Sequence, residues 1–265
     1  MRFFFLAIFF LSVLNTHAQD TLKLKFINSE TIPKGQVFIS KDMYDSSFIV
    51  NENTLRKVTK YNSASYSNSS LGELTSVDVT LPMFPILFYK ESQMIVNLNK
   101  DLGQMGIVNF AERFPNMSAS YVGNSVGRKI WLFDSNTGSV YLYNNTSYER
   151  HTAYKIEAVD EVKGVYSTLN NFFWIDKDNK LNAIDVNGKK VLEFELDTPF
   201  DSLQILGTDK IIYSLENKLY YIDLVRNKKF VIDTKEKSIL GFFYSTQKMS
   251  IFTDEKLNNY FLKLP

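Results

Sequence analysis

Few residues of this sequence have the types and the arrangement that acid–base or metal chemistry requires. His151 is the only histidine beyond the first 18 residues, so a histidine-rich metal site is excluded and a catalytic triad has a single candidate base. A general base needs a positioned partner. His151 instead lies among Tyr148, Arg150 and Thr152, and we expect it to be an exposed strand residue.

Acidic residues are plentiful, but their spacing matches no established site. Asp176 and Asp178 begin like a calcium-binding loop, yet Lys180 and Asn187 occupy the positions of the third ligand and the closing glutamate. The segment after Asp134 lacks the tryptophan of a sialidase-type aspartate box, and no glycine-rich phosphate loop or Gly-x-Ser-x-Gly elbow is present. We therefore assign no catalytic residue, and we predict neither a metal nor a cofactor. The acids near strand ends are expected to cap turns.

The elements that would position any site are indicated by an internal repeat. Three passages start at Asn170, Thr208 and Thr246, so the period is 38 residues, and each copy alternates apolar and polar side chains as a strand does. A fixed period of this length with strand-type alternation is typical of a β-propeller.

Strand-like runs elsewhere in the chain extend the same pattern. They fall into six groups, which begin near Val37, Leu74, Met117, Val165, Leu203 and Ile239. The last group has room for three strands, and the alternating run at residues 21–26 has no group of its own. The sequence therefore predicts an all-β fold, a single β-propeller of six blades, closed by pairing of residues 21–26 within the last blade. Five or seven blades remain as alternatives, because the first two groups are irregular.

Residues 1–18 have the organisation of a secretory signal. Arg2 supplies a positive charge, residues 3–14 are largely apolar, and Ala18 allows cleavage before Gln19. An apolar run of this length is too short to cross a bilayer, which needs about 20 helical residues. The absence of cysteine excludes a lipoprotein anchor and disulfides. We predict a signal peptide at residues 1–18, a β-propeller domain at residues 19–265, no transmembrane segment after cleavage, and a periplasmic or secreted location.

The charge balance argues against one class of partner. Removing Arg2 with the signal leaves 29 basic and 29 acidic side chains, a formal charge of zero. A chain without net charge or basic runs is poorly suited to nucleic-acid binding, which depends on releasing counterions from phosphates.

Trp131 and Trp174 allow two interpretations, as ligand-stacking platforms or as core residues. Trp174 aligns with Ile212 and Ser250 of the other repeat copies, inside a strand. We therefore expect its burial between blades.

Two resemblances add to this account. In residues 179–194, Asp185, Gly188 and Lys189 match the repeat of quinoprotein-type propellers, in which a strand ending in aspartate turns through glycine and lysine. The whole chain also resembles small, uncharacterised, exported bacterial β-propeller proteins, most closely at residues 77–90 and 130–134. This resemblance implies the fold and export. It also implies an accessory role beside gliding-associated protein secretion machinery, and it implies no activity.

Two hypotheses about function remain. The first is a non-enzymatic propeller that binds an envelope protein or a small ligand through the irregular stretches 61–72 and 111–117, with Tyr66, Arg113 and Phe114 as binding residues. The alternative is a propeller hydrolase or lyase that uses paired carboxylates, with calcium as a candidate ion. Three or more carboxylates converging on the central channel would favour the enzyme, whereas an apolar or plugged channel would favour the binding protein.

Overall fold

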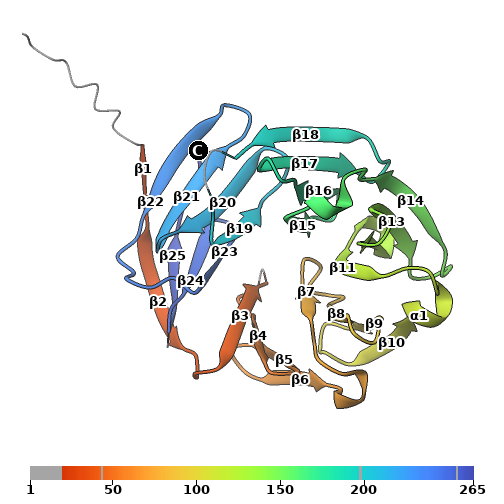
Figure 1. Cartoon of the computed structure of the whole chain (residues 1–265). Coiled ribbons are helices and arrows are strands. Elements are labelled where there is room, and N and C mark those ends of the chain that lie inside the picture. The colour runs from red at the N-terminus through yellow and green to blue at the C-terminus, as the bar shows by residue number, and fades with distance from the viewer. Residues whose placement is uncertain (1–19, 43, 197–198, 255) are drawn as a thin grey trace, which may run out of the picture.

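The computed structural model describes residues 20–42, 44–196, 199–254 and 256–265, and the predicted signal at residues 1–18 lies outside these ranges. Six small sheets stand in a ring, and the first strand of each group lies innermost (Figure 1). The predicted all-β propeller of six blades is confirmed. Within the described ranges, no helix is long and apolar enough to cross a membrane.

The first three blades are each four-stranded antiparallel sheets. Blade 1 contains β3 Gln36–Lys41, β4 Ser47–Asn51, β5 Thr54–Val58 and β6 Ser63–Ser67. Blade 2 contains β7 Ser76–Asp78, β8 Ile86–Tyr89, β9 Met94–Leu98 and β10 Gln104–Asn109. Blade 3 contains β11 Ala119–Asn124, β12 Lys129–Asp134, β13 Ser139–Asn144 and β14 Arg150–Lys155.

Blades 4 to 6 follow the same plan, and the last two take in strands from the N-terminal segment. Blade 4 contains β15 Gly164–Ser167, β16 Asn171–Ile175, β17 Lys180–Asp185 and β18 Lys190–Glu195. Blade 5 contains β19 Ser202–Ile205, β20 Lys210–Leu215, β21 Lys218–Asp223, β22 Lys228–Asp233 and β1 Thr21–Lys23. Blade 6 contains β23 Gly241–Ser245, β24 Lys248–Phe252, β25 Lys256–Phe261 and β2 Lys25–Thr31.

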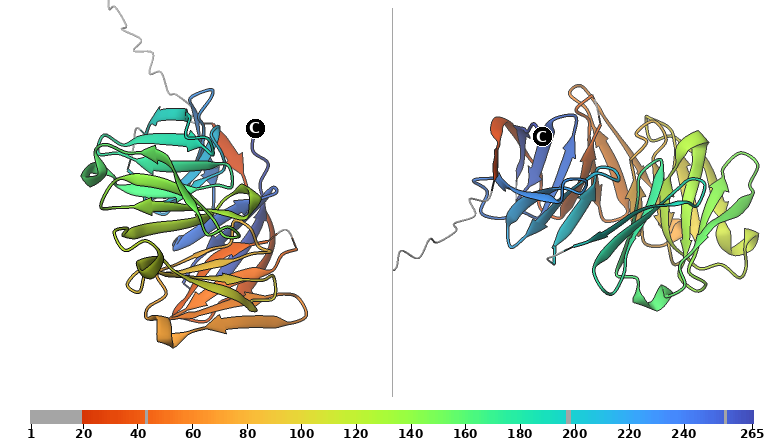
Figure 2. Two further views of the ribbon diagram at one scale, coloured as in Figure 1. Left: turned by 90° about the vertical axis from the view of Figure 1, so that its right-hand side faces the viewer. Right: turned by 90° about the horizontal axis from the view of Figure 1, so that it is seen from above.

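The N-terminal strands close the ring, as predicted, but they do so across two blades. β2 pairs antiparallel with β25 and becomes the fourth strand of blade 6. β1 pairs parallel with β22 of blade 5, so the single predicted strand at residues 21–26 is in fact two, and the second continues to Thr31. The chain crosses between the blades at Leu24, because Leu22 and Leu24 pack into the apolar cluster that blades 5 and 6 share. Figure 2 shows the C-terminal end of the chain beside these strands in both views.

Apolar side chains that face the neighbouring blade hold the blades together. Trp131 on β12 and Trp174 on β16 are both buried in the cluster between blades 3 and 4, which confirms the expected burial of Trp174. The Trp131 indole Nε1 donates to the Thr168 carbonyl at 3.1 Å, so its one polar group is satisfied. Burying roughly 200 Å² of indole stabilises the fold by about 5 kcal/mol.

The hairpin at Asn187 and Gly188 shows why glycine stands in this turn. Gly188 has φ +78°, and a Cβ there would lie 2.0 Å from the Ala153 carbonyl oxygen of β14. The Asp185 carboxylate accepts from the backbone amides of Asn187 and Lys189, at 2.9 and 3.0 Å. These bonds lower the pKa of Asp185, the Lys189 amide having the largest effect. The predicted turn is confirmed, and its glycine lets two blades approach closely.

The two stretches predicted to be irregular contain regular structure. Residues 61–72 include β6 and the 3-10 turn η1 Ser69–Leu71, and residues 111–117 include the end of α1 Phe110–Arg113. In β6 only Ala64 and Tyr66 face inward, and the remaining residues are small and polar. The strand alternation was therefore hidden by a composition typical of loops.

Candidate functional site

The centre of the ring does not meet the condition that would favour an enzyme. Asp78 on β7 is the one acidic residue in the six innermost strands, all of which the structure describes. Its carboxylate accepts from the Asn124 backbone amide at 2.9 Å and from the Asn124 side-chain amide at 3.2 Å, which joins blades 2 and 3. Among the described residues, no group of three or more histidine, aspartate or glutamate side chains is placed to hold a metal.

A second polar contact joins the innermost strands of blades 3 and 4. The Tyr121 hydroxyl donates to Ser167 Oγ at 3.0 Å. Burial and the nearby Asp78 carboxylate raise the pKa of Tyr121, so the phenol stays protonated and remains a donor. A Cβ on Gly123 would lie 2.3 Å from Ser167 Oγ, so these groups are closely packed. This part of the centre is a structural contact between blades.

Acidic residues near strand ends cap turns, as expected. The Asp134 carboxylate accepts from the Asn136 amide at 3.0 Å and from the Thr137 hydroxyl at 2.9 Å. Asp176 accepts from the amides of Asp178 and Lys180, both at 3.0 Å. His151, also as predicted, is an exposed residue of β14.

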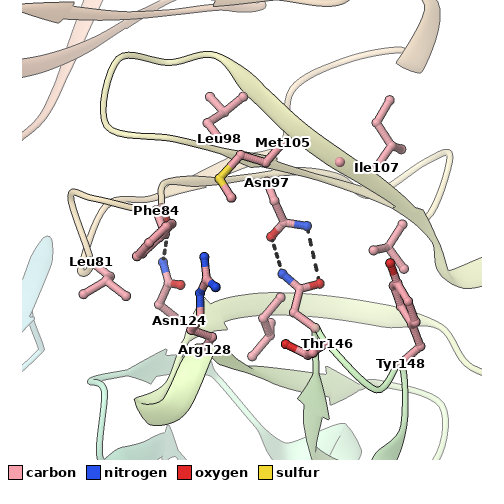
Figure 3. A pocket seen from close by; sticks show the side chains of 14 residues that line it. Leu81, Phe84, Asn97, Leu98, Met105, Ile107, Asn124, Arg128, Thr146 and Tyr148 are labelled. Carbon is pink, nitrogen blue, oxygen red and sulfur yellow. Dashed lines mark hydrogen bonds between the residues drawn. The ribbon is translucent and has the colours of Figure 1, made fainter.

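A pocket of about 210 Å³ lies between blades 2 and 3, and we call it the blade 2/3 pocket (Figure 3). Its walls come from β9, β10, the segment before β8, the turn after β11 and the hairpin between β13 and β14. The residues lining it are Leu81, Phe84, Asn97, Leu98, Met105, Gly106, Ile107, Val108, Asn124, Arg128, Ile130, Asn145, Thr146 and Tyr148. None of these residues is acidic.

The rim of the pocket exposes large apolar side chains. Met105 is 52% exposed, Ile107 41% and Tyr148 50%. Met83 and Val126, neighbours in sequence of the lining segments, are exposed as well. Met105, Ile107 and Tyr148 line the same pocket, and adjoining exposed apolar side chains mark interaction sites more often than single ones do.

Asparagine amides join the two blades inside the pocket. Asn145 Nδ2 donates to Asn97 Oδ1 at 2.8 Å, and the reverse bond measures 3.5 Å (Figure 3). The Asn124 side-chain amide also donates to the Phe84 carbonyl at 3.2 Å. These bonds fix the pocket between blades that have separate sheets.

Two arginines flank the pocket without a carboxylate partner. The Arg128 guanidinium lies 4.5 Å from the centre of the Phe84 ring, and that of Arg113 lies 4.6 Å from the centre of the Tyr148 ring. Neither arginine forms an ion pair with any residue that the structure describes. Stacking on a ring holds the guanidinium flat and leaves its N–H groups available to a carboxylate.

The backbone at the pocket is strained at two positions. Arg128 and Tyr148 both have φ 60°, in the left-handed region that bulky side chains avoid. Such a conformation costs about 1–2 kcal/mol, and ten other described non-glycine residues, all in connections between strands, also have a positive φ. The Tyr148 amide donates to the Asn144 carbonyl at 2.8 Å, and this turn keeps the tyrosine at the rim.

The structure separates the three residues that the sequence predicted to act together. Arg113 is exposed at the end of α1, over the Tyr148 ring. Phe114 is half-buried, with its ring between Phe110, Tyr143 and the Arg150 guanidinium, which lies 4.2 Å from it.

Tyr66 lies elsewhere, between blades 1 and 2. It is half-buried on β6, and its hydroxyl donates to Gln104 Oε1 at 2.7 Å. Gln104 begins β10, whereas Arg113 and Phe114 follow the other end of that strand. At about 3.4 Å per residue, the strand separates them by roughly 17 Å.

Sequence reasoning missed Met105, Ile107 and Arg128. The available signal was the spacing of Met105 and Ile107, two positions apart in a strand-like run, which places both on one face of a strand. Nothing in the sequence placed Arg128 beside them, because it comes from the next blade.

Comparisons with known proteins define the fold class. No family model matches the sequence, and no curated protein does. The chain is similar to virginiamycin B lyase from Staphylococcus aureus, at 12% identity and a TM-score of 0.55 over 91% of this chain and 94% of that one. It is also similar to a chain of BBS1N in complex with ARL6DN, at 12% identity and a TM-score of 0.53 over 84% and 76%. A chain of the mitotic checkpoint complex matches at 11% identity and a TM-score of 0.54 over 92% and 86%. At these identities the likeness concerns the fold alone, and the protein is a six-bladed β-propeller.

Proposed function

We propose that this protein is an exported, non-enzymatic β-propeller that binds a protein partner in the cell envelope through the blade 2/3 pocket. An accessory role beside protein secretion machinery is part of the proposal, motivated by the resemblance to exported bacterial propellers. The signal-like residues 1–18 support export.

The size of the pocket favours a protein partner over a free small molecule. Sites for small molecules commonly enclose about 300–1,000 Å³. The blade 2/3 pocket, at about 210 Å³, has room for one or two side chains. A partner would insert an apolar side chain here and cover the exposed Met105 and Ile107 around it.

The observation that carries the proposal is the pairing of exposed apolar side chains with arginines that have no carboxylate partner. Methionine, tyrosine and arginine are enriched at interface centres, and arginine and tyrosine dominate binding energy there. Arg113 and Arg128 flank a pocket without acidic residues, so the complementary segment carries carboxylates beside its apolar anchor.

The enzymatic alternative has less support. An enzyme of that kind requires several carboxylates around the channel. Asp78 is the one acidic residue in the innermost strands, and it is hydrogen-bonded to Asn124. The likeness to a lyase rests on 12% identity and carries no catalytic residue across. Two of the similar chains come from structures of protein complexes, which fits the use of such a propeller in assemblies.

The binding residues predicted from the sequence keep their place as a proposal. Arg113 would touch the partner directly, and Phe114 would hold the α1 turn that carries it. Tyr66 would support β10 through Gln104, the residue before Met105.

Charge reversal tests the proposal. The variant Arg113→Glu/Arg128→Glu should lose a partner that the wild type captures from an envelope extract, because two carboxylates would then face the acidic segment. A matched control reverses Lys189 and Lys263, which are exposed and lie outside the pocket. Equal capture of the partner by both double variants would show that the blade 2/3 pocket is not the binding site.

A further inference from the structure

The seam between blade 6 and blade 1, where the ring closes, is packed differently from the other blade contacts. Among the described residues, its buried apolar cluster has five members: Ile32, Phe38, Ile49, Phe252 and Leu257. The cluster between blades 2 and 3 has eleven buried members, Ile86 and Leu132 among them. The seam leaves a cavity of about 500 Å³, which we call the seam cavity. Its volume lies within the range of sites for small molecules.

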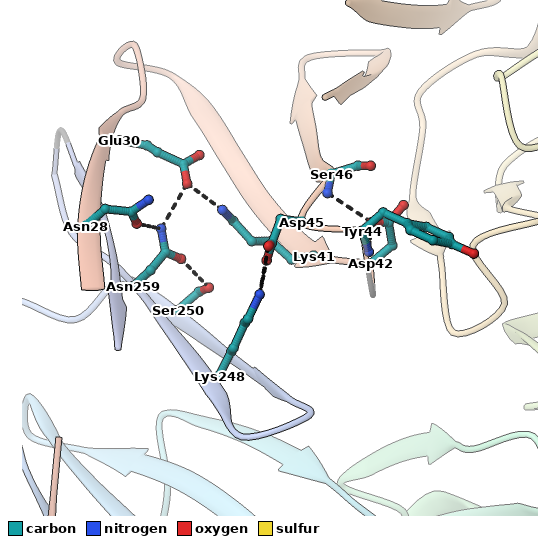
Figure 4. Close-up of polar contacts among 10 residues, drawn as sticks. All are labelled: Asn28, Glu30, Lys41, Asp42, Tyr44, Asp45, Ser46, Lys248, Ser250 and Asn259. Atoms are coloured by element: carbon teal, nitrogen blue, oxygen red, sulfur yellow. Dashed lines mark hydrogen bonds and ion pairs between the residues drawn. The ribbon is translucent and has the colours of Figure 1, made fainter. Parts of the chain in front are cut away.

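One wall of the seam cavity is a polar network at blade 6 (Figure 4). The Asn259 side-chain amide donates to Asn28 Oδ1 at 2.8 Å and to Glu30 Oε1 at 2.9 Å. Ser250 Oγ bonds Asn259 Oδ1 at 2.7 Å, and Lys41 pairs with the same Glu30 oxygen. Ser250 and Asn259 are buried and line the cavity, so their polar groups are shielded from bulk water.

The opposite wall belongs to blade 1. The buried Asp42 carboxylate accepts from the amides of Tyr44 and Ser46, both at 2.9 Å, and pairs with Lys57 at 3.3 Å. Asp45 pairs with Lys248 of blade 6 at 2.7 Å, across the seam (Figure 4). The three acidic residues of the cavity, Glu30, Asp42 and Asp45, each lie beside a lysine, whereas Lys60 has no acidic partner among the described residues.

The lining indicates the chemistry of the occupant. Three lining residues are acidic, Glu30, Asp42 and Asp45, and three are lysines, Lys41, Lys60 and Lys248, so the formal charges cancel. A charged ligand that contacts the Glu30–Lys41 or Asp45–Lys248 pair would compete with the partner already present there. A neutral ligand need not, because an ammonium offers three donors and a carboxylate oxygen accepts more than one bond.

Hydroxyl groups suit this wall best, because each can donate to a carboxylate and accept from an ammonium or amide at once. Tyr44 adds an aromatic ring at the edge of the cavity and is 78% exposed. A tyrosine ring can stack on the apolar C–H face of a sugar, while the tyrosine hydroxyl remains in water. We infer that the seam cavity binds a short neutral saccharide, held by the Asp45–Lys248 and Glu30–Lys41 pairs and stacked on Tyr44.

The inference concerns a site separate from the blade 2/3 pocket, so each can fail without the other. The test uses the chain without residues 1–18, with maltotriose, cellotriose and N-acetylated chitotriose as neutral probes, and zwitterionic triglycine and anionic citrate as charged probes. Saturation-transfer NMR and isothermal titration should detect at least one trisaccharide and neither charged compound.

Variants then locate the site. Tyr44→Ala should weaken saccharide binding by at least about tenfold. Tyr61→Ala is the matched control, because Tyr61 is 86% exposed on the same blade and does not line the cavity, and it should bind as the wild type does. Lys248→Met is a second variant, which should also weaken binding, since it removes donors from the far wall.

Three results would overturn the inference: none of the trisaccharides binds, triglycine or citrate binds in their place, or both Tyr44→Ala and Lys248→Met keep wild-type affinity. Circular dichroism of each variant shows whether lost binding reflects lost folding. If Tyr44→Ala or Lys248→Met unfolds, the saccharide affinity of the variant that remains folded decides whether the inference holds.

Discussion

At the scale of single residues, carboxylates near strand ends bond to the turn beside them. Asp134 and Asp176 cap their turns in this way, and His151 is exposed, as local chemistry predicted. The half-burial of Phe114 could not be deduced in this way, because its neighbours Tyr143 and Arg150 lie in the next blade. Local bonding can be deduced from adjacent residues, whereas burial depends on what the ring brings alongside.

A glycine pair tests the close approach of blades. Gly188→Ala should lower the free energy of unfolding by about 3 kcal/mol or more, since it adds a clash with the Ala153 carbonyl to the strain of a positive φ. Gly127→Ala is the control: φ there is +66°, but no atom lies within 4 Å of the added Cβ, so about 1 kcal/mol should be lost. Denaturant unfolding measures both, and equal losses would mean that the clash is relieved.

Buried tyrosines predict a loss of stability at alkaline pH. Burial raises the pKa of Tyr89 and of Tyr221 to about 12, and neither hydroxyl has a hydrogen-bond partner among the described residues. The folded state therefore holds these protons more tightly than the unfolded chain, where the pKa is about 10. Their contribution is complete below about pH 10 and is lost as the pH rises towards 12.

The measurement is phenolate absorbance at about pH 11, midway through this window, in native buffer and in denaturant. The native protein should show less phenolate than the unfolded chain. Equal absorbance with an intact far-UV spectrum would contradict the burial of these phenols.

At the scale of elements, the strands were predictable because their alternation is local. The innermost strands begin within two residues of the six predicted group starts, for example Gly164 against a predicted start at Val165. β6 was missed because all of its residues except Ala64 and Tyr66 are serines, a composition typical of loops. The division of the N-terminal strand was also missed, because it depends on two blades that lie more than 200 residues further along the chain.

The N-terminal strands offer a test of ring closure. Deleting residues 19–27 removes β1 and the start of β2, which exposes the edges of β22 and β25 and should promote aggregation. A milder version, Leu22→Asp/Leu24→Asp, should lower the melting temperature, because both leucines pack between blades 5 and 6. Lys23→Asp/Lys25→Asp is the matched control, since both lysines are exposed. A truncated protein that stays monomeric and melts unchanged would show that closure does not depend on this segment.

At the scale of the whole molecule, the fold was predictable and the candidate site was not. Three copies of the repeat follow one another at a period of 38 residues and can be recognised in the sequence. The blade 2/3 pocket, in contrast, forms only where separate repeats meet. Asn97 and Asn145 are 48 positions apart, and Asp45 and Lys248 are 203 apart. Sites between blades therefore require the closed ring before they can be recognised.

The ion pair across the seam contributes little to holding the ring. The side chains of Asp45 and Lys248 are about half exposed, and such pairs are worth up to about 1 kcal/mol. Lys248→Met should therefore change the melting temperature only slightly, and a large drop would show that the pair is structural. The apolar clusters between blades 5 and 6 and between blades 6 and 1 stabilise the closed ring instead.

The central claim, that the blade 2/3 pocket binds a protein, is tested most directly by site-specific photocrosslinking in the cells that produce the chain. A photoreactive phenylalanine at position 148, on the pocket rim, should yield one discrete adduct, and the same group at position 61, on an exposed surface of blade 1, should not. The adduct should disappear when Arg113 and Arg128 are reversed to glutamate. No adduct from position 148, or the same adduct from both positions, would contradict the account.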